Sequence, residues 1–324
     1  MVQRSLMAGA AAGFAALSVT QAAVAAPYAL AQRWTVGEAG RWDYAEVDPV
    51  RQRLFLSHGD RVEVLDMGSG KPLNAINGTS GVHGVALAQD LKLGFTSNGR
   101  ANTVTAFDLE TLQVKAQGKV SGTNPDAILY EPASHKLYTF NGKSADVTVM
   151  DAVSLKVLAT MPVGGKPEFA VSDGSGKVYV NIEDKAEIVV LDVASDKVTA
   201  HYALAGCEEP TGLAMDVPHA RLFSVCQNNV MAVTDARTGK RVASVPIGAH
   251  PDAAYYDAAS ATVFSSNGEG SLSVIHQADP DHYSAEQTVQ TQKGARTMAF
   301  DPASKRVFLP LAADGKFTVL VLSR

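Results

Sequence analysis

The sequence is poor in cysteine, in net charge and in long apolar runs. Two cysteines among 324 residues exclude a scaffold held together by many disulfides. The formal net charge of −5 provides no overall positive field, so nucleic acid is a disfavoured partner. The apolar run at residues 6–19 is too short to cross a bilayer as a helix, so no membrane span is expected.

Specific catalytic motifs are also missing. The chain has no C-x-x-C or C-x-x-C-H sequence, which excludes thioredoxin-like and c-type haem motifs. The Gly-Ser-Gly-Lys runs at residues 68–71 and 174–177 do not fit a phosphate-binding loop, and we interpret them as hairpin turns. The motifs therefore favour a protein that is not an enzyme, although they leave catalysis open.

The N terminus has the layout of a secretory signal. Arg4 precedes the uncharged run, and Ala23-Val24-Ala25 forms a signal-peptidase site. No cysteine follows the run and no Arg-Arg pair precedes it, so neither a lipid anchor nor twin-arginine export is indicated. We predict a signal peptide at residues 1–25, Sec-dependent export and a soluble periplasmic protein. Cleavage after Ala31 is the alternative.

The two cysteines, Cys207 and Cys226, form an even pair in a chain predicted to reach an oxidising compartment. Such a pair usually forms a disulfide, and we expect one here. Two free thiols and a redox site are the alternatives.

A pattern that recurs seven times dominates the rest of the chain. Each copy has an acidic residue in a first turn, then an aromatic residue, then an apolar segment that usually ends in a second acidic residue. The first acidic residues are Asp48, Asp90, Glu131, Asp173, Asp216, Asp257 and Asp301, spaced by 42, 41, 42, 43, 41 and 44 residues. The aromatic residues are Phe55, Phe95, Tyr138, Tyr179, Phe223, Phe264 and Phe308. The second acidic residues are Asp66, Asp108, Asp151, Asp192 and Asp235, and the last two copies lack them.

Each copy divides into four short segments, as in the fourth copy at residues 168–172, 177–181, 188–192 and 197–203. These segments are rich in Val, Ile and Tyr, and turn residues interrupt them too often for helices. Four strands per repeat of this length are typical of a propeller blade. We predict an all-β, seven-bladed β-propeller of four-stranded blades at residues 26–324.

The last copy ends after its third strand, at residues 317–322. Residues 33–37 resemble the fourth strands of other copies, so an N-terminal strand is expected to complete the last blade and close the ring.

The repeat also carries a family resemblance. Val147-Thr148-Val149-Met150-Asp151, Val163-Gly164-Gly165-Lys166-Pro167 and Lys177-Val178-Tyr179-Val180-Asn181 resemble the YVTN-type β-propeller repeat. Over nearly the whole mature chain the pattern is similar to that of the exported YncE-like proteins. This resemblance implies a seven-bladed, mostly periplasmic propeller, and it implies no catalytic residues because the repeat is a packing motif.

Most of the repeated acidic residues are expected to cap turns, because a carboxylate there accepts backbone N–H bonds. Glu46 departs from the pattern, since it lies inside a first strand where other copies have Ala88, Leu129, Val171 or Tyr255. We expect it either to face channel water or to pair with a base.

Function in a propeller usually resides where loops meet at the channel mouth, and counting back from the first acidic residues places a charged set there. The ligand-binding candidates are Arg41, Trp42, Asp43, His83, Asp126, Lys166, Glu168, His250, Asp252 and Arg296. Gathered carboxylates raise one another's pKa or recruit a cation, and nearby imidazoles favour a transition metal. The candidate ligands of a divalent metal are His58, His83, His250, Asp43 and Asp126. The alternative is that charged residues merely solvate the channel opening.

Three functions remain open. The first is an exported, monomeric binding or scaffold protein that presents its mouth to a small molecule, a peptide or a partner protein. The second is a metal-dependent or acid/His-dependent hydrolase or lactonase at the mouth. The third is single-stranded nucleic-acid binding, which an acidic mouth disfavours.

Overall fold

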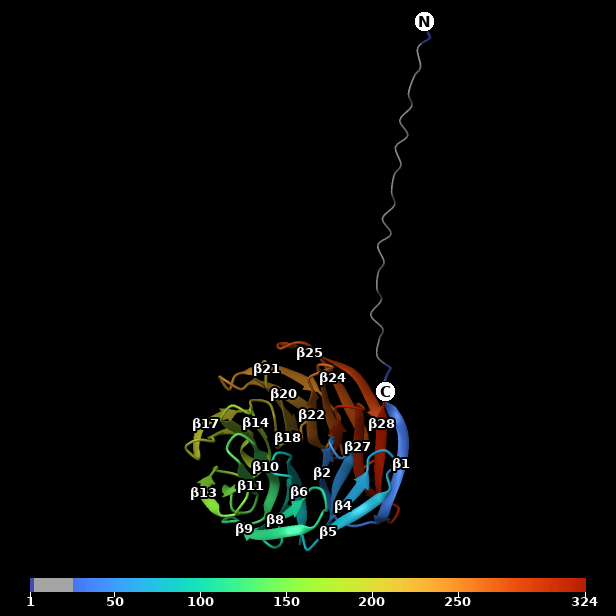
Figure 1. Cartoon of the computed structure of the whole chain (residues 1–324). Helices are drawn as coiled ribbons and strands as arrows, with labels where there is room; N and C mark the ends of the chain where they lie inside the picture. Colours follow the sequence, from blue (N-terminus) through green and yellow to red (C-terminus); the bar gives the residue numbers. More distant parts are fainter. Residues whose placement is uncertain (3–25) are drawn as a thin grey trace.

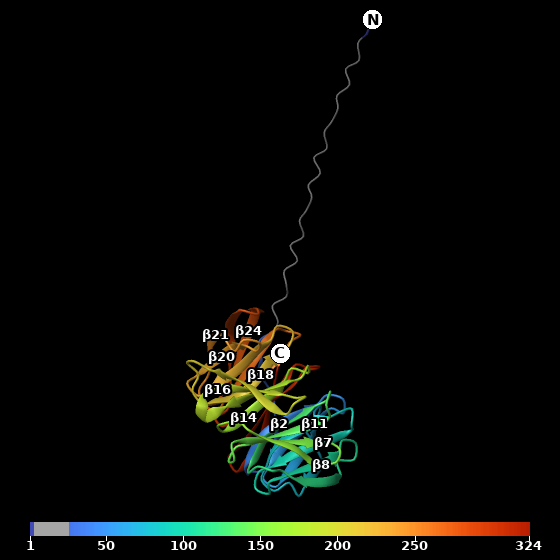
Figure 2. The same cartoon turned by 90° about the vertical axis from the view of Figure 1, so that its left-hand side faces the viewer.

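The structure, a computed structural model, describes residues 1–2 and 26–324. The predicted signal peptide lies, apart from its first two residues, outside the described residues. The described chain forms 28 strands in seven four-stranded antiparallel sheets that surround a central axis (Figure 1). Blades with β7, β8 and β11 lie across the ring from those with β20, β21 and β24 (Figures 1 and 2). The predicted seven-bladed β-propeller is confirmed.

Each blade runs from an inner strand at the axis to an outer strand at the rim. The first three blades are β2 (Trp42–Asp48), β3 (Arg53–His58), β4 (Arg61–Asp66) and β5 (Pro72–Asn77); β6 (Val82–Ala88), β7 (Leu93–Asn98), β8 (Thr103–Asp108) and β9 (Val114–Lys119); and β10 (Pro125–Glu131), β11 (Lys136–Asn141), β12 (Asp146–Asp151) and β13 (Val157–Pro162). The next two are β14 (Pro167–Ser172), β15 (Lys177–Ile182), β16 (Glu187–Asp192) and β17 (Lys197–Ala203); and β18 (Pro210–Asp216), β19 (Arg221–Cys226), β20 (Val230–Asp235) and β21 (Arg241–Pro246). The sixth blade is β22 (Pro251–Asp257), β23 (Thr262–Asn267), β24 (Ser271–Asp279) and β25 (His282–Gln290).

The seventh blade contains both ends of the continuous described chain, residues 26–324. Its inner strands are β26 (Ala299–Asp301), β27 (Arg306–Ala313) and β28 (Lys316–Ser323), and its outer strand is β1 (Ala29–Glu38). β1 pairs antiparallel with β28, with Trp34 opposite Val319, and the two strands lie side by side in Figure 1. The predicted closure by an N-terminal strand is therefore confirmed, and it ties the two ends of the ring together.

The repeated aromatic residues form the core between blades. Phe55, Phe95, Tyr138, Phe223, Phe264 and Phe308 are completely buried, and Tyr179 is nearly so. Phe55 of the first blade contacts Phe107 of the second, with ring centres 5.7 Å apart. Because each core cluster is shared by two neighbouring blades, as with Phe140 and Val180, the repeat determines the fold through packing.

The second acidic residues cap turns, as predicted. Asp66 accepts a hydrogen bond from the Ser69 backbone amide at 2.8 Å, and Asp151 accepts one from that of Ser154 at 2.7 Å. Asp108, Asp192 and Asp235 have equivalent contacts. These bonds satisfy backbone donors that a tight turn would otherwise leave to water.

The register of the second copy differs from the prediction. Ala88 ends β6 where Asp48 ends β2, and Asp90 comes two residues later. Asp90 instead accepts a hydrogen bond from the Tyr130 hydroxyl, 2.8 Å away, so it links two blades rather than capping the turn. Positions at the channel mouth that are counted back from Asp90 therefore lie two residues too far toward the C terminus.

Only one helical element occurs in the described chain, the three-residue 3-10 helix η1 (Glu183–Lys185). Among the described residues no helix has the length and apolar character needed to cross a bilayer. Cys207 and Cys226 form a disulfide with Cα atoms 5.4 Å apart, as expected. This bond connects the loop before β18 to the end of β19 and reinforces the fifth blade at its mouth end.

Candidate functional site

The seven inner strands bring equivalent residues together at the channel mouth. In six blades the first residue of the inner strand pairs with the last residue of the second strand, as Trp42 pairs with His58 and Pro125 with Asn141. The residue that follows occupies the mouth, and Arg296 takes this position in the seventh blade, five residues before Asp301. We call these seven residues the mouth ring: Asp43, His83, Asp126, Glu168, Thr211, Asp252 and Arg296.

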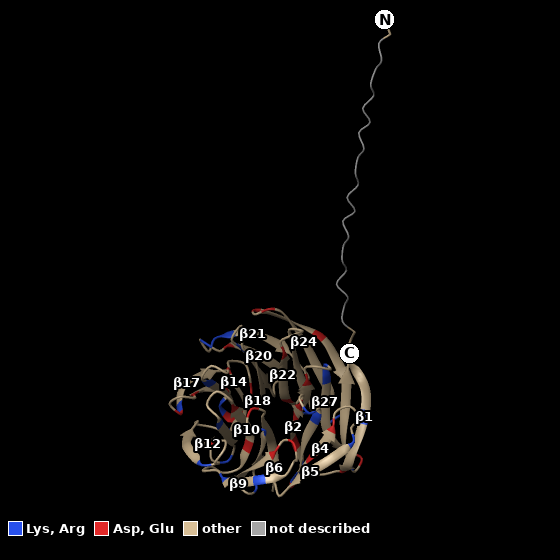
Figure 3. Cartoon of the chain, in the orientation of Figure 1, with Lys and Arg blue, Asp and Glu red and all other residues tan. Residues whose placement is uncertain are grey.

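Around the ring, acidic and basic side chains alternate over five consecutive blades, in the order Asp252, Arg296, Asp43, His83 and Asp126. His83 Nδ1 lies 2.6 Å from Asp43 Oδ2 and 3.5 Å from Asp126 Oδ1. Arg296 Nη1 lies 3.0 Å from Asp252 Oδ2, and its Nη2 lies 4.0 Å from Asp43 Oδ1. Each basic side chain thus bridges the carboxylates of the two neighbouring blades. Acidic residues gather around the channel near β2 and β10 in Figure 3.

The other two members of the ring have different surroundings. Lys166 Nζ lies 2.5 Å from Glu168 Oε1 and also contacts the carboxylate of Glu183 in η1. Thr211 is buried, and its hydroxyl donates a hydrogen bond to the Pro251 carbonyl at 2.9 Å. The fourth blade therefore adds a lysine shared by two carboxylates, and the fifth blade adds no charge.

The mouth ring has more carboxylate than it can stabilise in the ionised state. Burial raises the pKa of Asp252 to about 6, and the charges of Asp43 and Asp126 add to this effect against the charge of Arg296. Although Arg296 is close, Asp252 Oδ2 is buried and has no hydrogen bond from any described residue. Burial also raises the pKa of Asp126, opposed by His83 and reinforced by Asp43. A ligand that brings positive charge would relieve this repulsion.

Among the described residues, one group of three potential metal ligands has its ligand atoms close together, and it consists of Asp43, His83 and Asp126. One ligand atom from each lies within 4.8 Å of the other two. His83 Nδ1 faces both carboxylates, whereas its Nε2 lies against Gly99, where an added Cβ would be only 2.6 Å away. Two carboxylates and an imidazole suit a divalent metal ion such as Zn²⁺ or Mn²⁺.

The two carboxylates favour the protonated form of His83. Burial acts to lower the pKa of His83, but the hydrogen bond to Asp43 and the charge of Asp126 outweigh it and raise the pKa. Because a metal needs the neutral imidazole, the ion would have to displace a proton from Nδ1.

Two histidines predicted as metal ligands are not in the mouth ring. His58 is buried against Phe317, with ring centres 4.4 Å apart, and its Nδ1 lies 3.3 Å from Glu63. His250 is exposed and has a left-handed backbone with φ of 56°. The hairpin that carries His58 lies one strand farther from the axis than the inner strands, whereas His250 directly precedes the inner strand β22. The group of close ligand atoms formed by Asp43, His83 and Asp126 includes neither histidine.

The remaining predicted residues border the mouth. Arg41 and Trp42 line a cavity of about 620 Å³ together with Asp43, His83 and Arg296. The Arg296 guanidinium lies 5.8 Å from the centre of the Trp42 ring. Trp42 also packs against the core between the first and last blades, so it contributes to packing as well as to the cavity wall. Its indole N–H is buried without a hydrogen-bond partner among the described residues.

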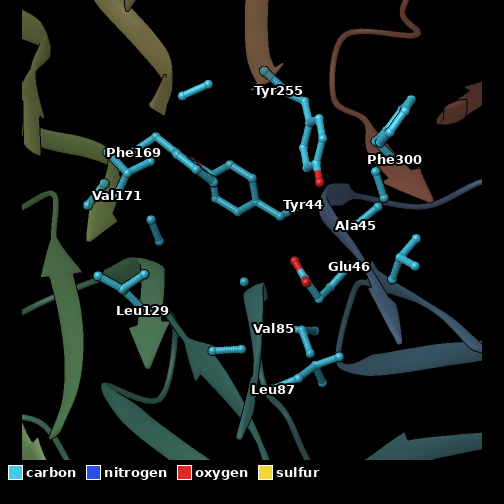
Figure 4. A pocket seen from close by; sticks show the side chains of 18 of the residues that line it. Tyr44, Ala45, Glu46, Val85, Leu87, Leu129, Phe169, Val171, Tyr255 and Phe300 are labelled. Atoms are coloured by element: carbon cyan, nitrogen blue, oxygen red, sulfur yellow. The ribbon is translucent and has the colours of Figure 1, made fainter. Parts of the chain in front are cut away.

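Sequence reasoning missed Tyr44 and Glu183. Tyr44 follows Asp43 on β2 yet packs against a core cluster of the third and fourth blades, with its ring centre 5.4 Å from that of Phe169. Its side chain therefore crosses the channel, as Figure 4 shows. Glu183 lies in the unpredicted helix η1. Tyr44 could have been selected from the sequence because it is an aromatic residue directly after the mouth position Asp43. No feature of the sequence pointed to Glu183.

Comparisons with known proteins support the fold. No family model matches the chain. Antigen Lp49 from Leptospira interrogans is 26% identical over 141 residues, which are 41% of this chain and 31% of that protein. The chain thus spans about a third of the length of this relative.

Two solved structures are similar in architecture. A chain of hydrazine synthase from Kuenenia stuttgartiensis has a TM-score of 0.74 at 14% identity and covers 86% of this chain and 94% of its own. A chain of the mitotic checkpoint complex has a TM-score of 0.79 at 12% identity, covering 97% and 99%. At these identities the likeness establishes the propeller fold and carries no function.

Proposed function

We propose that this chain is an exported binding protein that takes its ligand at the mouth ring, and that the ligand presents a positive charge to the ring. The observation that carries the proposal is the unbalanced carboxylate. Asp43, Asp126, Glu168 and Asp252 converge from four blades, while Arg296 is the only ring member with a permanent positive charge. Repulsion among buried carboxylates destabilises the empty protein, and a bound cation removes it.

The space above the ring suits a small molecule or one side chain of a peptide or protein partner. The cavity of about 620 Å³ lies within the usual range for ligand pockets. The buried carboxylates disfavour the phosphates of a single-stranded nucleic acid at the ring itself, while the wall of the cavity above it also contains Arg41, Arg100 and Lys143.

Export and kinship with the YVTN-repeat, YncE-like propellers belong to this proposal. The disulfide supports an oxidising compartment. Tyr28 is buried, lies 5.3 Å from Phe264 between ring centres, and donates its backbone N–H to Gln287 at 2.9 Å. Cleavage after Ala25 would keep these contacts, whereas cleavage after Ala31 would remove them. We therefore propose a mature periplasmic monomer that begins at Ala26.

The test is a thermal-shift and calorimetric comparison of the mature protein with its Asp126→Asn/Asp252→Asn variant. The cationic probes are Mn²⁺, Zn²⁺ and putrescine, and citrate is the anionic probe. We expect at least one cation to stabilise the wild type and to bind the variant at least tenfold more weakly. Equal binding of every cation by both proteins, or stabilisation by citrate alone, would overturn the proposal.

A metal-dependent hydrolase or lactonase is the second candidate, and the Asp43, His83 and Asp126 set is the observation that favours it. A divalent ion held there would supply a Lewis acid and an activated water. Asp43 and Asp126 would provide oxygen ligands and His83 Nδ1 a nitrogen ligand, from three neighbouring blades.

Metal content decides between the two candidates. Mature protein purified without a chelator or affinity tag is measured by mass spectrometry beside the His83→Ala variant. The control is His219→Ala, because His219 forms a similar pair with Asp216 at 2.8 Å at the other end of an inner strand. About one equivalent of metal that only His83→Ala removes would favour the hydrolase, and ester and lactone assays would follow. Absence of metal would leave the binding protein.

A further inference from the structure

Beyond Tyr44, on the side away from the mouth ring, the channel contains a second cavity of about 650 Å³. Its wall consists mainly of Ala, Val, Leu, Met and aromatic side chains from the inner strands of all seven blades. Lining residues such as Pro49 and Pro302 follow the ends of inner strands, so the cavity extends toward the face opposite the mouth. We call this cavity the lower chamber.

Glu46 is the only acidic or basic side chain in the wall of the lower chamber. It pairs with Phe55, and the residues that pair with the matching aromatic in the other blades are Ala86, Leu129, Val171, Ala214, Tyr255 and Ala299. Six of the seven equivalent positions therefore carry no charge. Packing alone does not explain a carboxyl group at the seventh.

The Glu46 carboxyl group points into the open centre of the chamber, and the Tyr255 hydroxyl is directed toward the same space (Figure 4). Among the described residues Glu46 has no cationic partner, and the one charge that acts on it is the like charge of Asp48 on its own strand. The expected pairing of Glu46 with a base is therefore wrong, and the alternative that it faces the channel is confirmed. An unpaired carboxylate in apolar surroundings is costly unless a ligand supplies the partner.

Aromatic rings surround the same space. Tyr44 and Phe169 meet at one side, with centres 5.4 Å apart, and Tyr255 and Phe300 meet at the other, with centres 4.7 Å apart. Aromatic faces attract organic cations, and a carboxylate beside them adds a direct ion pair. We propose that the lower chamber binds an organic ammonium ion with an apolar body, whose charged group lies against Glu46 and these aromatic rings. This site is separate from the mouth ring and goes beyond the proposed function.

The proposal has a measurable consequence for protons. Burial, with a smaller contribution from Asp48, raises the pKa of Glu46 to about 8. The other titratable group that faces it is Tyr255, whose pKa burial and Glu46 raise to about 12, so this hydroxyl stays neutral. Glu46 is thus mostly protonated in the empty chamber at pH 7. An ammonium ion would favour the carboxylate, and binding would release about one proton to the buffer.

The experiment is calorimetry of the full mature protein with 2-phenylethylamine, which is cationic at pH 7, and with 2-phenylethanol, its neutral analogue of similar size. Titrations in two buffers of different ionisation enthalpy count the protons released. We expect the wild type to prefer the amine at least tenfold and to release close to one proton. In Glu46→Gln the preference should fall to within about twofold and the proton release should disappear.

Two further variants make the result decisive. Glu46→Ala places the residue of three equivalent positions at this site, and it serves if Glu46→Gln fails to fold by circular dichroism. Asp126→Asn/Asp252→Asn alters the mouth ring and should leave amine binding by the lower chamber unchanged. Failure of the wild type to bind the amine, equal binding of the alcohol, or no proton release would overturn the proposal. Loss of amine binding only in the mouth variant would overturn it and would favour the proposed function instead.

Discussion

The two ends of β22 carry the same side chain in opposite circumstances. Asp257, at the turn end, is buried and accepts hydrogen bonds from Lys305 Nζ at 2.8 and 2.9 Å and from Ser260 Oγ at 2.6 Å. Burial acts to raise its pKa, but these bonds outweigh burial and lower it. Asp252, at the mouth end, has one buried oxygen without a hydrogen bond and a pKa raised to about 6 by burial.

Other inner strands also carry an acidic residue near each end: Asp43 and Asp48 belong to β2, and Asp126 and Glu131 belong to β10. At the turn end Asp48 accepts a bond from the Val50 amide at 3.0 Å, and Glu131 accepts one from that of Ser134 at 2.8 Å. The turn carboxylates therefore stabilise the fold, whereas the mouth carboxylates are retained despite their cost to it. This difference is the physical reason for proposing that a ligand binds at the mouth.

The fifth blade departs most from this division between mouth and turn carboxylates. Its mouth end has no carboxylate in the ring and has the Cys207–Cys226 disulfide instead. Removing the bond in Cys207→Ser/Cys226→Ser should lower the free energy of unfolding by about 3 kcal/mol, the loop-closure value for a loop of this size. Urea unfolding monitored by circular dichroism measures the loss. A loss as small as that of a surface mutation would show that the mouth end of this blade contributes little to stability.

The direct test of the comparison is to replace each aspartate of β22 in turn. Asp257→Asn should lower the free energy of unfolding by about 2 kcal/mol, because the Lys305 ammonium loses its counter-charge in a partly buried site. Asp252→Asn should change it by less than about 0.5 kcal/mol or increase it, since repulsion in the ring is relieved. The measurement is urea unfolding at pH 7. Equal losses from both variants would contradict the distinction between the two ends.

How much of this comparison could be predicted from the sequence depends on the level of structure. The repeat predicted the blades and their strands closely; the fourth strand expected at residues 197–203 matches β17. Counting five residues back from each turn acid placed Asp43, Asp126, Glu168, Asp252 and Arg296 correctly in one ring. In the second blade the count is two residues out of register because Asp90 is not the turn cap, and the candidate His83 occupies the ring.

Depth in the channel could not be predicted in the same way. His58 belongs to a hairpin one strand from the axis, and local packing against Phe317 determines its position. The direction of Tyr44 across the channel depends on space left by residues of the other blades, including Phe169, which are distant in sequence. The pattern within one repeat reflects packing inside a blade. It contains little information about the shape of the channel that the seven blades surround.

The dependence of stability on pH should separate the two ends of β22 again. Between the unfolded pKa of Asp252, near 4, and its folded value of about 6, the folded protein holds a proton that the unfolded chain has lost. Stability therefore falls as pH rises through this window, and Asp252→Asn should remove that part of the fall. Asp257 has a lowered pKa, so its contribution is lost instead as pH falls below 4. Urea midpoints between pH 3 and pH 8 test both directions, and an unchanged profile in Asp252→Asn would contradict the assignment.

The smallest expected effect is the titration of His83, which reports the mouth ring without changing stability much. Its pKa is raised by the hydrogen bond to Asp43 and the charge of Asp126, against the effect of burial. Asp43→Asn should therefore lower the pKa of His83, observed by NMR of the ring nitrogens. Asp60→Asn is the matched control, since Asp60 is an exposed carboxylate on the same face that pairs with Arg100 at 3.0 Å. If both substitutions shifted His83 equally, overall charge and not the contact across two blades would determine its protonation.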